Sequence, residues 1–277
     1  MLKIVGGIDR SPREGRAAIV IPARFSSSRF PGKPLATLRG AGGRIKSLVE
    51  RSWDAAKAVT SVTQIWIATD DLRIADAAIA FGAKVVLTDP ACRNGTERCW
   101  DAVVTASIDA EIIINLQGDA PLTPPLAIEA IIAAMRADVS LPVVTPMIRC
   151  SPLQCARLVD EANRGRVGGT TVVVDHAGNA LYFSKRVIPH VPADMVDPPL
   201  YLHVGVYGYR RQALAAYAAL AAPFIEGVEG LEQLRFLHAG IPVRMIEIAD
   251  PPGGLWEVNN PADIVTVELA LTERRLG

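Results

Sequence analysis

The sequence has no excess of charge of either sign. Lys and Arg together number 29, and so do Asp and Glu, which gives a formal net charge of zero at pH 7. A chain with no overall positive field is a poor partner for nucleic acid or an anionic membrane. Aromatic residues make up only 5% of the chain, and no basic stripe alternates with them, as is typical of nucleic-acid binders. We therefore expect neither nucleic acid nor membrane as a partner.

Cysteine is scarce as well. The four cysteines form no CxxC pair and no zinc-ligand spacing: Cys92, Cys99, Cys150 and Cys155. This usage excludes a disulfide scaffold and favours a reduced, cytoplasmic chain.

Long apolar segments are also missing. No apolar run approaches the ~18 residues of a membrane-spanning helix. The N-terminal segment MLKIVGGIDRSPREGRAA has neither the apolar centre nor the cleavage pattern of an export signal, and we expect residues 1–16 to be a short polar leader. Half of the 277 residues are hydrophobic, which is typical of a globular chain of one large or two small domains.

Short apolar runs alternate with helical patterns in the first half of the chain. The runs expected to form strands are residues 17–22, 64–69, 84–88 and 111–116. The segments expected to form helices are residues 47–58, 72–81, 98–106 and 127–136. Strands that are apolar almost throughout are buried on both faces, so the pattern predicts an α/β fold with an open, mostly parallel sheet.

The second half has a different pattern. The expected strands are residues 170–174, 180–183, 204–209 and 243–248, the first two joined by the turn DHAGN. The expected helices are residues 211–220, 229–238 and 261–275, the last with Asn260 as N-cap and Pro261 in its first turn. We expect a core at residues 17–150 and a smaller, more antiparallel portion at 151–277 that completes the same fold.

Polar residues follow the strands of the first half directly. Arg24, Asp70, Asp71 and Asp119 stand at or just beyond strand ends. In open α/β sheets ligands bind beyond the carboxyl ends of the strands, so these residues mark the expected site.

The loop IPARFSSSRFPGKPL, residues 21–35, is the strongest local signal. It places Arg24, Arg29 and Lys33 among small residues after a buried strand. Such a loop can surround a polyphosphate with backbone N–H groups and cationic side chains. Neither GxxxxGK[ST] nor GxGxxG is present, so this is not one of the common phosphate loops. A solvated basic loop is the alternative.

Several further segments, in order, make the chain similar to a known family. They are ATDD (68–71), NGTER (94–98), NLQGDAP (115–121), ALYFSK (180–185), HVGVYGYR (203–210) and LEQLR (231–235). With the loop at 21–35 they resemble the CMP-sugar synthetases, most closely the 3-deoxy-manno-octulosonate (Kdo) cytidylyltransferases. The resemblance covers about residues 18–268. It implies a Rossmann-like nucleotidyltransferase sheet with a smaller antiparallel extension.

The resemblance implies transfer of CMP from CTP to a 2-keto-3-deoxy sugar acid, with release of pyrophosphate, as in lipopolysaccharide biosynthesis. Arg24, Arg29 and Lys33 would hold the triphosphate and stabilise the leaving pyrophosphate, and Asp119 would bind Mg²⁺. The alternative for Asp119 is an aspartate in a strand-end turn. The resemblance also implies a homodimer formed through the second half, where residues 204–209 would extend a sheet across subunits.

The remaining implied residues surround the two substrates. Near cytosine or ribose these are Asn94, Gly95, Thr96 and Arg98, with Gln117 as a further substrate-binding residue. For the sugar acid they are His203, Tyr207, Glu232 and Gln233, with Lys185 facing a carboxylate or a phosphate. Structural alternatives exist: a helix N-terminus with Thr96 as cap, a structural histidine, an exposed helix face at 232–233, and a surface lysine.

The chain departs from the family pattern at four places. Ala120 replaces an acidic residue, Asn259 replaces the aspartate that would share Mg²⁺ with Asp119, Lys185 replaces an arginine, and Thr170–Thr171 lacks a lysine. An amide oxygen still ligates Mg²⁺ but carries no formal charge. Two alternatives therefore stay open: CMP transfer to another acidic acceptor, such as another ulosonic acid or a small phosphonate, and a non-catalytic nucleotide-binding paralogue.

Overall fold

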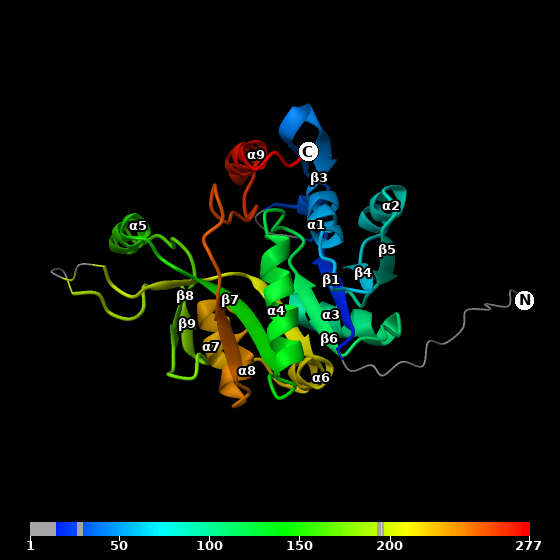
Figure 1. Cartoon of the computed structure of the whole chain (residues 1–277). Coiled ribbons are helices and arrows are strands. Elements are labelled where there is room, and N and C mark those ends of the chain that lie inside the picture. The colour runs from blue at the N-terminus through cyan, green and yellow to red at the C-terminus, as the bar shows by residue number, and fades with distance from the viewer. Residues whose placement is uncertain (1–14, 27–29, 193–194, 196) are drawn as a thin grey trace, which may run out of the picture.

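A ten-stranded sheet forms the centre of the molecule (Figure 1). The computed structural model describes residues 15–26, 30–192, 195 and 197–277. Along the sheet the strands are β5 (Lys84–Leu87), β4 (Gln64–Thr69), β1 (Ala17–Ala23), β6 (Ile112–Leu116), β11 (Val206–Arg210), β7 (Val143–Arg149), β10 (Tyr201–His203), β8 (Thr171–Val174) and β9 (Ala180–Ser184), while β12 (Val243–Glu247) pairs with β7.

The first four strands of this order are parallel, as the apolar runs predicted. β1 lies between β4 and β6 and is buried along its whole length. Burial on both faces explains why its sequence, AAIVIPA, shows no alternation of polar and apolar residues. The predicted open α/β sheet is confirmed.

β11 enters the parallel region from the second half of the chain. It pairs antiparallel with β6 on one side and with β7 on the other. Both of its edges are therefore occupied, so it cannot extend a sheet into another subunit, and that part of the dimer prediction is wrong. β7 was not expected as a strand, and neither were β10 or the small hairpin of β2 (Thr37–Arg39) and β3 (Ile45–Ser47).

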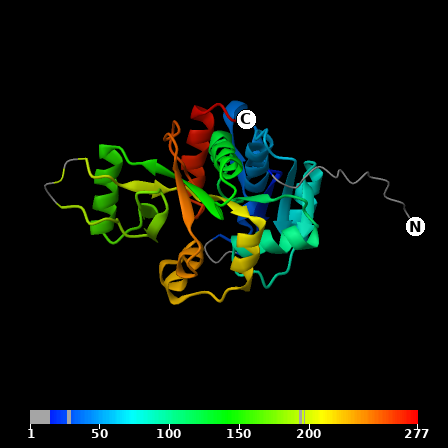
Figure 2. The ribbon, with the colours of Figure 1, turned by 60° about the horizontal axis from the view of Figure 1, so that its bottom comes forward.

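Helices cover both faces of the sheet. The helices of the described part are α1 (Leu48–Lys57), α2 (Leu72–Ala80), α3 (Gly95–Thr105), α4 (Pro125–Ala137), α5 (Pro152–Asn163), α6 (Arg211–Ala219), α7 (Phe224–Glu229), α8 (Leu234–His238) and α9 (Asp263–Glu273). Apolar residues of α3, α6 and α8 form one core cluster with the sheet, and those of α1, α2 and α4 form another. Figure 2 shows α6 (yellow) and α4 (green) on opposite sides of the sheet.

The last two predicted helices begin later in the structure than in the sequence pattern. The helix expected at 229–238 is split, because Gly230 has φ +60 and ends α7, and α8 begins only at Leu234. α9 begins at Asp263 rather than at Pro261, and Asn260 is not its cap. Instead the Asp263 carboxylate accepts hydrogen bonds of 2.7 Å from the backbone N–H groups of Asn259 and Asn260.

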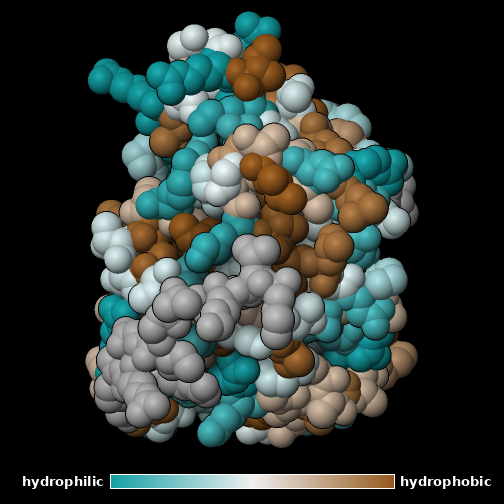
Figure 3. All heavy atoms as spheres, turned by 90° about the vertical axis from the view of Figure 1, so that its right-hand side faces the viewer, coloured by the Kyte–Doolittle hydropathy of each residue, from teal (hydrophilic) through white to brown (hydrophobic). Residues whose placement is uncertain are grey.

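The edge of the sheet at β5 exposes a few large aliphatic side chains. Leu87 on β5 and Leu72 and Ile79 on α2 are each more than half exposed. The face that includes this edge shows apolar patches between hydrophilic ones (Figure 3). β5 has only four residues, and a short edge strand offers little backbone for pairing with another chain.

None of the helices in the described part of the chain is long and apolar enough to cross a membrane. All four cysteines lie within that part and carry no disulfide.

Candidate active site

The predicted phosphate loop and the predicted metal residue are in contact. Lys33 begins the short 3₁₀ turn η1 (Lys33–Leu35), and Asp119 lies in the turn that follows β6. The Lys33 ammonium lies 2.5 Å from Asp119 Oδ2. These residues are 86 positions apart in the chain, so the fold brings them together at the carboxyl end of the parallel strands.

The loop that carries Lys33 is closed by Phe25. The Gly32 N–H donates to the Phe25 carbonyl at 3.0 Å, and Gly32 has φ +69, which a side chain would disfavour. The Arg73 guanidinium stacks 3.4 Å from the centre of the Phe25 ring. Arg24 lies exposed just after β1, and Arg29 lies outside the described residues.

The Asp119 turn is held from two sides. Ser52 Oγ donates to the Gly118 carbonyl at 3.1 Å. The Val258 N–H donates to the Asp119 carbonyl at 3.0 Å, which places Asn259 beside Asp119. The resemblance implied that Asn259 lies near Asp119, and the backbones of the two segments are in contact in the structure.

The donor set at this turn suits Mg²⁺ in part. In the described part of the chain no three His, Cys, Asp or Glu side chains form a metal-binding group. Asp119 offers one carboxylate and Asn259 an amide oxygen, and both are donor types that Mg²⁺ accepts. Mg²⁺ is commonly held by one or two carboxylates together with substrate phosphates rather than by an all-protein cage. The residues present therefore fit a Mg²⁺ ion that is held jointly with substrate phosphates better than one held by the protein alone.

The NGTER segment forms the N-terminus of α3. Asn94, rather than Thr96, is the N-cap, and its side chain accepts from the Glu97 N–H at 2.9 Å. The Gln117 side chain lies against Gly95, where an added Cβ would be 3.2 Å from Gln117 Oε1. Gln117, expected only as a substrate-binding residue, is thus a neighbour of the first turn of α3.

Glu232 meets this helix from the other half of the chain. Its carboxylate accepts from the N–H groups of Gly95 (3.3 Å) and Thr96 (3.0 Å) and from the Thr96 hydroxyl (2.7 Å). Burial raises the pKa of Glu232, and the hydrogen bonds from Thr96 and Gly95 oppose that effect. The structure therefore joins the NGTER and LEQLR segments directly.

Arg98 has structural partners. It is 2% exposed, and it donates to the Thr88 hydroxyl at 2.6 Å and to Asp70 at 2.9 Å. These contacts connect α3 to the ends of β4 and β5 and leave the guanidinium engaged in the fold.

The residues expected around the sugar acid lie together on β10, β11 and the α7–α8 turn. The Tyr207 hydroxyl donates to Gln233 Oε1 at 3.1 Å, and the rings of His203 and Tyr207 lie 5.3 Å apart. The ammonium of Lys185 lies against Gly230, where a Cβ would be 2.8 Å from it. Burial raises the pKa of Tyr207 well above its usual range, so its hydroxyl remains a donor.

Comparison with known proteins agrees with this arrangement. A model of the cytidylyltransferase family matches residues 18–246. The 3-deoxy-manno-octulosonate cytidylyltransferase of Maricaulis maris is 48% identical over 250 residues, which are 90% of this chain and 94% of the relative. This chain belongs to the 3-deoxy-manno-octulosonate cytidylyltransferase family.

Two further relatives add to the family assignment. A solved CMP:2-keto-3-deoxy-manno-octonic acid synthetase complexed with CTP aligns with a TM-score of 0.80 at 36% identity, covering 94% of this chain and 99% of that one. The 8-amino-3,8-dideoxy-manno-octulosonate cytidylyltransferase of Shewanella woodyi is 38% identical, covering 91% of this chain and 97% of the relative. The predicted family and fold are confirmed, while the names of the relatives include two different sugar acids.

His203 of this cytidylyltransferase carries a neutral ring. Burial lowers its pKa to about 3. Its Nε2 lies 2.9 Å from Thr145 Oγ1, and that hydroxyl donates to the Val206 carbonyl at 2.8 Å. The proton of the Thr145 hydroxyl is therefore engaged with the Val206 carbonyl and is not available to His203. We infer that His203 Nε2 carries a hydrogen and donates it to Thr145 Oγ1.

We expect the neutral His203 to make the fold sensitive to acid. Between pH 6.5 and about 3 the unfolded chain binds a proton at this histidine and the folded chain does not, so the free energy of unfolding falls as the pH falls. From pH 7 to pH 5 the loss should be about 1–2 kcal/mol, measured by urea unfolding. His203→Gln should lose less over the same interval. Equal losses in both proteins would contradict the neutral ring.

Some residues of the site were not predicted. Ser52, Arg73 and Val258 position the loops around Lys33 and Asp119 through the contacts given above. Arg235 and Glu226 form ion pairs behind the first turn of α3. Arg235 was quoted only as part of LEQLR, and its partners lie on other elements, Glu226 on α7 and Glu97 on α3, so the motif alone did not indicate its role.

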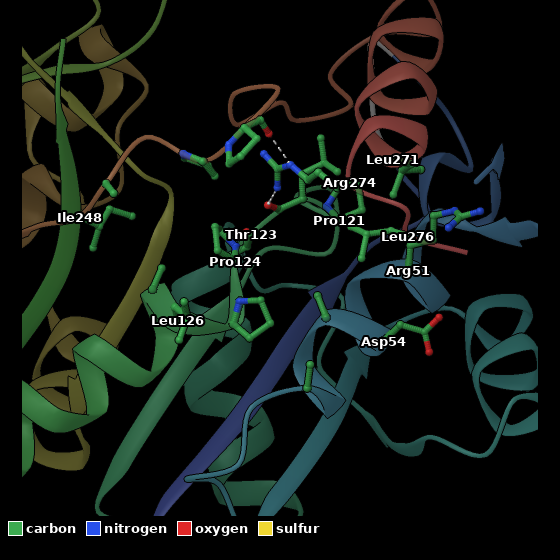
Figure 4. A pocket seen from close by; sticks show the side chains of 18 of the residues that line it. Arg51, Asp54, Pro121, Thr123, Pro124, Leu126, Ile248, Leu271, Arg274 and Leu276 are labelled. Carbon is green, nitrogen blue, oxygen red and sulfur yellow. Dashed lines mark hydrogen bonds between the residues drawn. The ribbon is translucent and has the colours of Figure 1, made fainter. Parts of the chain in front are cut away.

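A cavity of about 670 Å³ lies beneath the segment that follows the Asp119 turn, between α1, α4 and the C-terminal residues (Figure 4). None of the predicted site residues that the structure describes lines it. Arg274 donates to the carbonyls of Leu122 and Pro252, both at 2.7 Å, and so connects the segments that carry Asp119 and Asn259. The cavity is thus separate from the candidate site but shares its supporting segments.

Proposed function

We propose that this cytidylyltransferase transfers CMP from CTP to Kdo and releases pyrophosphate. One observation carries the proposal: the fold of a Kdo cytidylyltransferase family member places the Lys33–Asp119 pair, the N-terminus of α3 and the His203–Tyr207–Gln233 group around one end of the sheet. A nucleotide needs cations and a metal-binding carboxylate for its phosphates, and a hydroxylated acid needs neutral polar groups for its hydroxyls.

The reaction requires placement more than a protein nucleophile. A hydroxyl oxygen of the acceptor attacks the α-phosphorus of CTP, the bond from that phosphorus to the bridging oxygen breaks, pyrophosphate leaves with the electron pair of that bond, and the hydroxyl proton passes to water. Such a transfer is promoted by neutralising phosphate charge and aligning the two oxygens. We assign the charge neutralisation to Arg24, Arg29 and Lys33.

We assign Asp119 and Asn259 to Mg²⁺. When bound, the ion neutralises charge on the phosphate oxygens. The Lys33 ammonium is paired with the Asp119 carboxylate. We propose that this ammonium moves to a phosphate oxygen when the nucleotide binds. Because Asn259 is neutral, the Asp119 carboxylate supplies the negative charge that this pair offers to the metal.

In this proposal each half of the chain binds one of the two substrates. We propose that residues 17–150 bind CTP, with Asn94, Gly95, Thr96 and Gln117 on the base and ribose side, while Arg98 supports the first turn of α3 through Thr88 and Asp70. We propose that residues 151–277 bind the acceptor, through His203, Tyr207, Glu232 and Gln233, with Lys185 as the cation for its carboxylate. Neutral hydroxyl, amide and imidazole groups suit the hydroxyls of a sugar acid.

The test is pyrophosphate release from CTP and Mg²⁺. The reactions contain Kdo, its 8-amino-8-deoxy derivative, a sialic-type acid, a small phosphonate, or no acceptor. We expect the highest kcat/KM with Kdo. Release of pyrophosphate only with another acid would leave the proposed CMP transfer in place and show that Kdo is not the acceptor. Calorimetric binding of CTP without release for any acceptor would support a non-catalytic paralogue.

We also propose a cytoplasmic homodimer. The four unpaired thiols suit a reducing compartment. Sedimentation velocity measures the subunit number.

A further inference from the structure

A buried arginine of α8 connects α3 to α7. Arg235 is 1% exposed. Its Nη1 donates to Glu97 on α3 at 2.9 Å, and its Nε and Nη2 donate to the two oxygens of Glu226 on α7, both at 2.6 Å. The guanidinium also lies 4.1 Å from the centre of the Tyr217 ring. One side chain thus fixes two carboxylates from two separate elements.

The partners of Arg235 compensate for the burial of its charge. Burial alone would lower the pKa of Arg235, but the hydrogen bonds to Glu226 and Glu97 raise it. Burial alone would raise the pKa of Glu97, but the bonds from Arg93 and Arg235 hold it below its usual value. Only a planar fork with several N–H groups meets both carboxylates at once, so lysine cannot reproduce the contact.

The segment that carries Arg235 also contacts both proposed substrate sites. Glu232 accepts from the backbone and the hydroxyl of Thr96 on the nucleotide side. Gln233 accepts from the hydroxyl of Tyr207 on the acceptor side. Residues 232–235 therefore lie between the first turn of α3 and the acceptor group, and Arg235 anchors their far end.

We propose that Arg235 is a positioning residue that couples CTP binding to acceptor binding. This inference rests on the proposed function, because that function assigns the first turn of α3 to CTP and the Tyr207–Gln233 pair to the acceptor. Through its ion pairs Arg235 makes α3 and residues 232–235 move as one unit. A ligand on either side therefore orders the other side in advance, and the second ligand binds more tightly.

The experiment compares the wild type with Arg235→Lys, Glu226→Gln and a matched control. The control is Arg93→Met, because Arg93 pairs with the same Glu97 at 2.5 Å but from the solvent side, where it is 54% exposed. Circular dichroism and the melting temperature show whether each variant is folded. Calorimetry gives the Kd of CTP with and without saturating Kdo, with Mg²⁺ omitted to prevent turnover.

In the wild type we expect Kdo to tighten CTP binding about fivefold or more, the usual lower range of coupling between two sites. Arg235→Lys should bring this ratio close to one, Glu226→Gln should reduce it, and Arg93→Met should leave it unchanged. A folded Arg235→Lys protein with the wild-type ratio would overturn the proposal, and so would a wild-type ratio of one or an equal loss in Arg93→Met.

Turnover separates this result from the proposed function. If the wild type does not use Kdo, the proposed function is wrong about the acceptor, and the coupling ratio is measured with whichever acid supports release of pyrophosphate. If Kdo is used but the ratio in Arg235→Lys is unchanged, the proposed function stands and only the inference about Arg235 fails.

Discussion

Asp119→Asn should lower kcat by about 10²–10³-fold, the range found when one charge-stabilising group is removed from an active site. Asp119 carries the one carboxylate of the proposed metal-binding pair, because its neighbour Asn259 is neutral. Its side chain is 26% exposed and its partner Lys33 is 14% exposed, so the pair is mostly buried, and leaving the Lys33 ammonium without its carboxylate should lower the free energy of unfolding by about 1–3 kcal/mol. Pyrophosphate release and urea unfolding measure the two effects.

Two companion variants separate the metal from the phosphate role. Lys33→Met should raise the KM for CTP, because the variant lacks a cation for the phosphate oxygens. Asn259→Asp should lower that Mg²⁺ concentration, since a second carboxylate is added. An Asp119→Asn protein with the wild-type rate and the wild-type Mg²⁺ dependence would remove Asp119 from the proposed site.

The parallel half of the sheet could be predicted because its signals are local. β4 has the same bounds in the structure as in the sequence pattern, and a polar segment ends it on each side. β7 was missed because Pro146 interrupts its apolar run, and proline argues against a central strand. The structure accommodates Pro146, whose carbonyl accepts from the Val204 N–H at 3.0 Å.

The order of the strands was beyond local reasoning. The segment that forms β11 was recognised as a strand, but its neighbours β6 and β7 are set by contacts far apart in the chain. The break between α7 and α8 was missed for a different reason. A helical pattern over 229–238 was compatible with the residues, and only the left-handed conformation of Gly230 shows where the chain turns.

The site shows the same division between local and distant information. Lys33 and Asp119 were each predicted from their own motif, and the structure adds their contact. Arg98 was placed with the nucleotide by its motif, whereas its described partners are Asp70 and Thr88. No spacing reveals which carboxylate a buried guanidinium will meet, and for that reason Arg235 also had no predicted role.

Gly118→Ala should lower kcat by about 10²-fold, although the change adds only one methyl group. An added Cβ would lie 2.7 Å from the Pro22 carbonyl oxygen and 3.6 Å from the Ala23 Cβ. Because the nearest atom belongs to the backbone of the buried strand β1, the Gly118 turn must move instead. Asp119 is the next residue, and a displacement of about 1 Å at a reacting centre costs on the order of 10²-fold in rate.

The variant should also unfold more easily, because overpacking a buried position costs about 1–3 kcal/mol. Gly227→Ala is the matched control, since a Cβ at Gly227 would meet no atom within 4 Å; it should keep the wild-type rate and be at least as stable as the wild type, because Gly227 lies within α7. If Gly118→Ala loses stability but keeps the wild-type kcat, the turn tolerates displacement and Asp119 does not need its observed place. If the rate falls while CTP binding is retained, the close approach of Gly118 to β1 is what positions Asp119 for the transfer step.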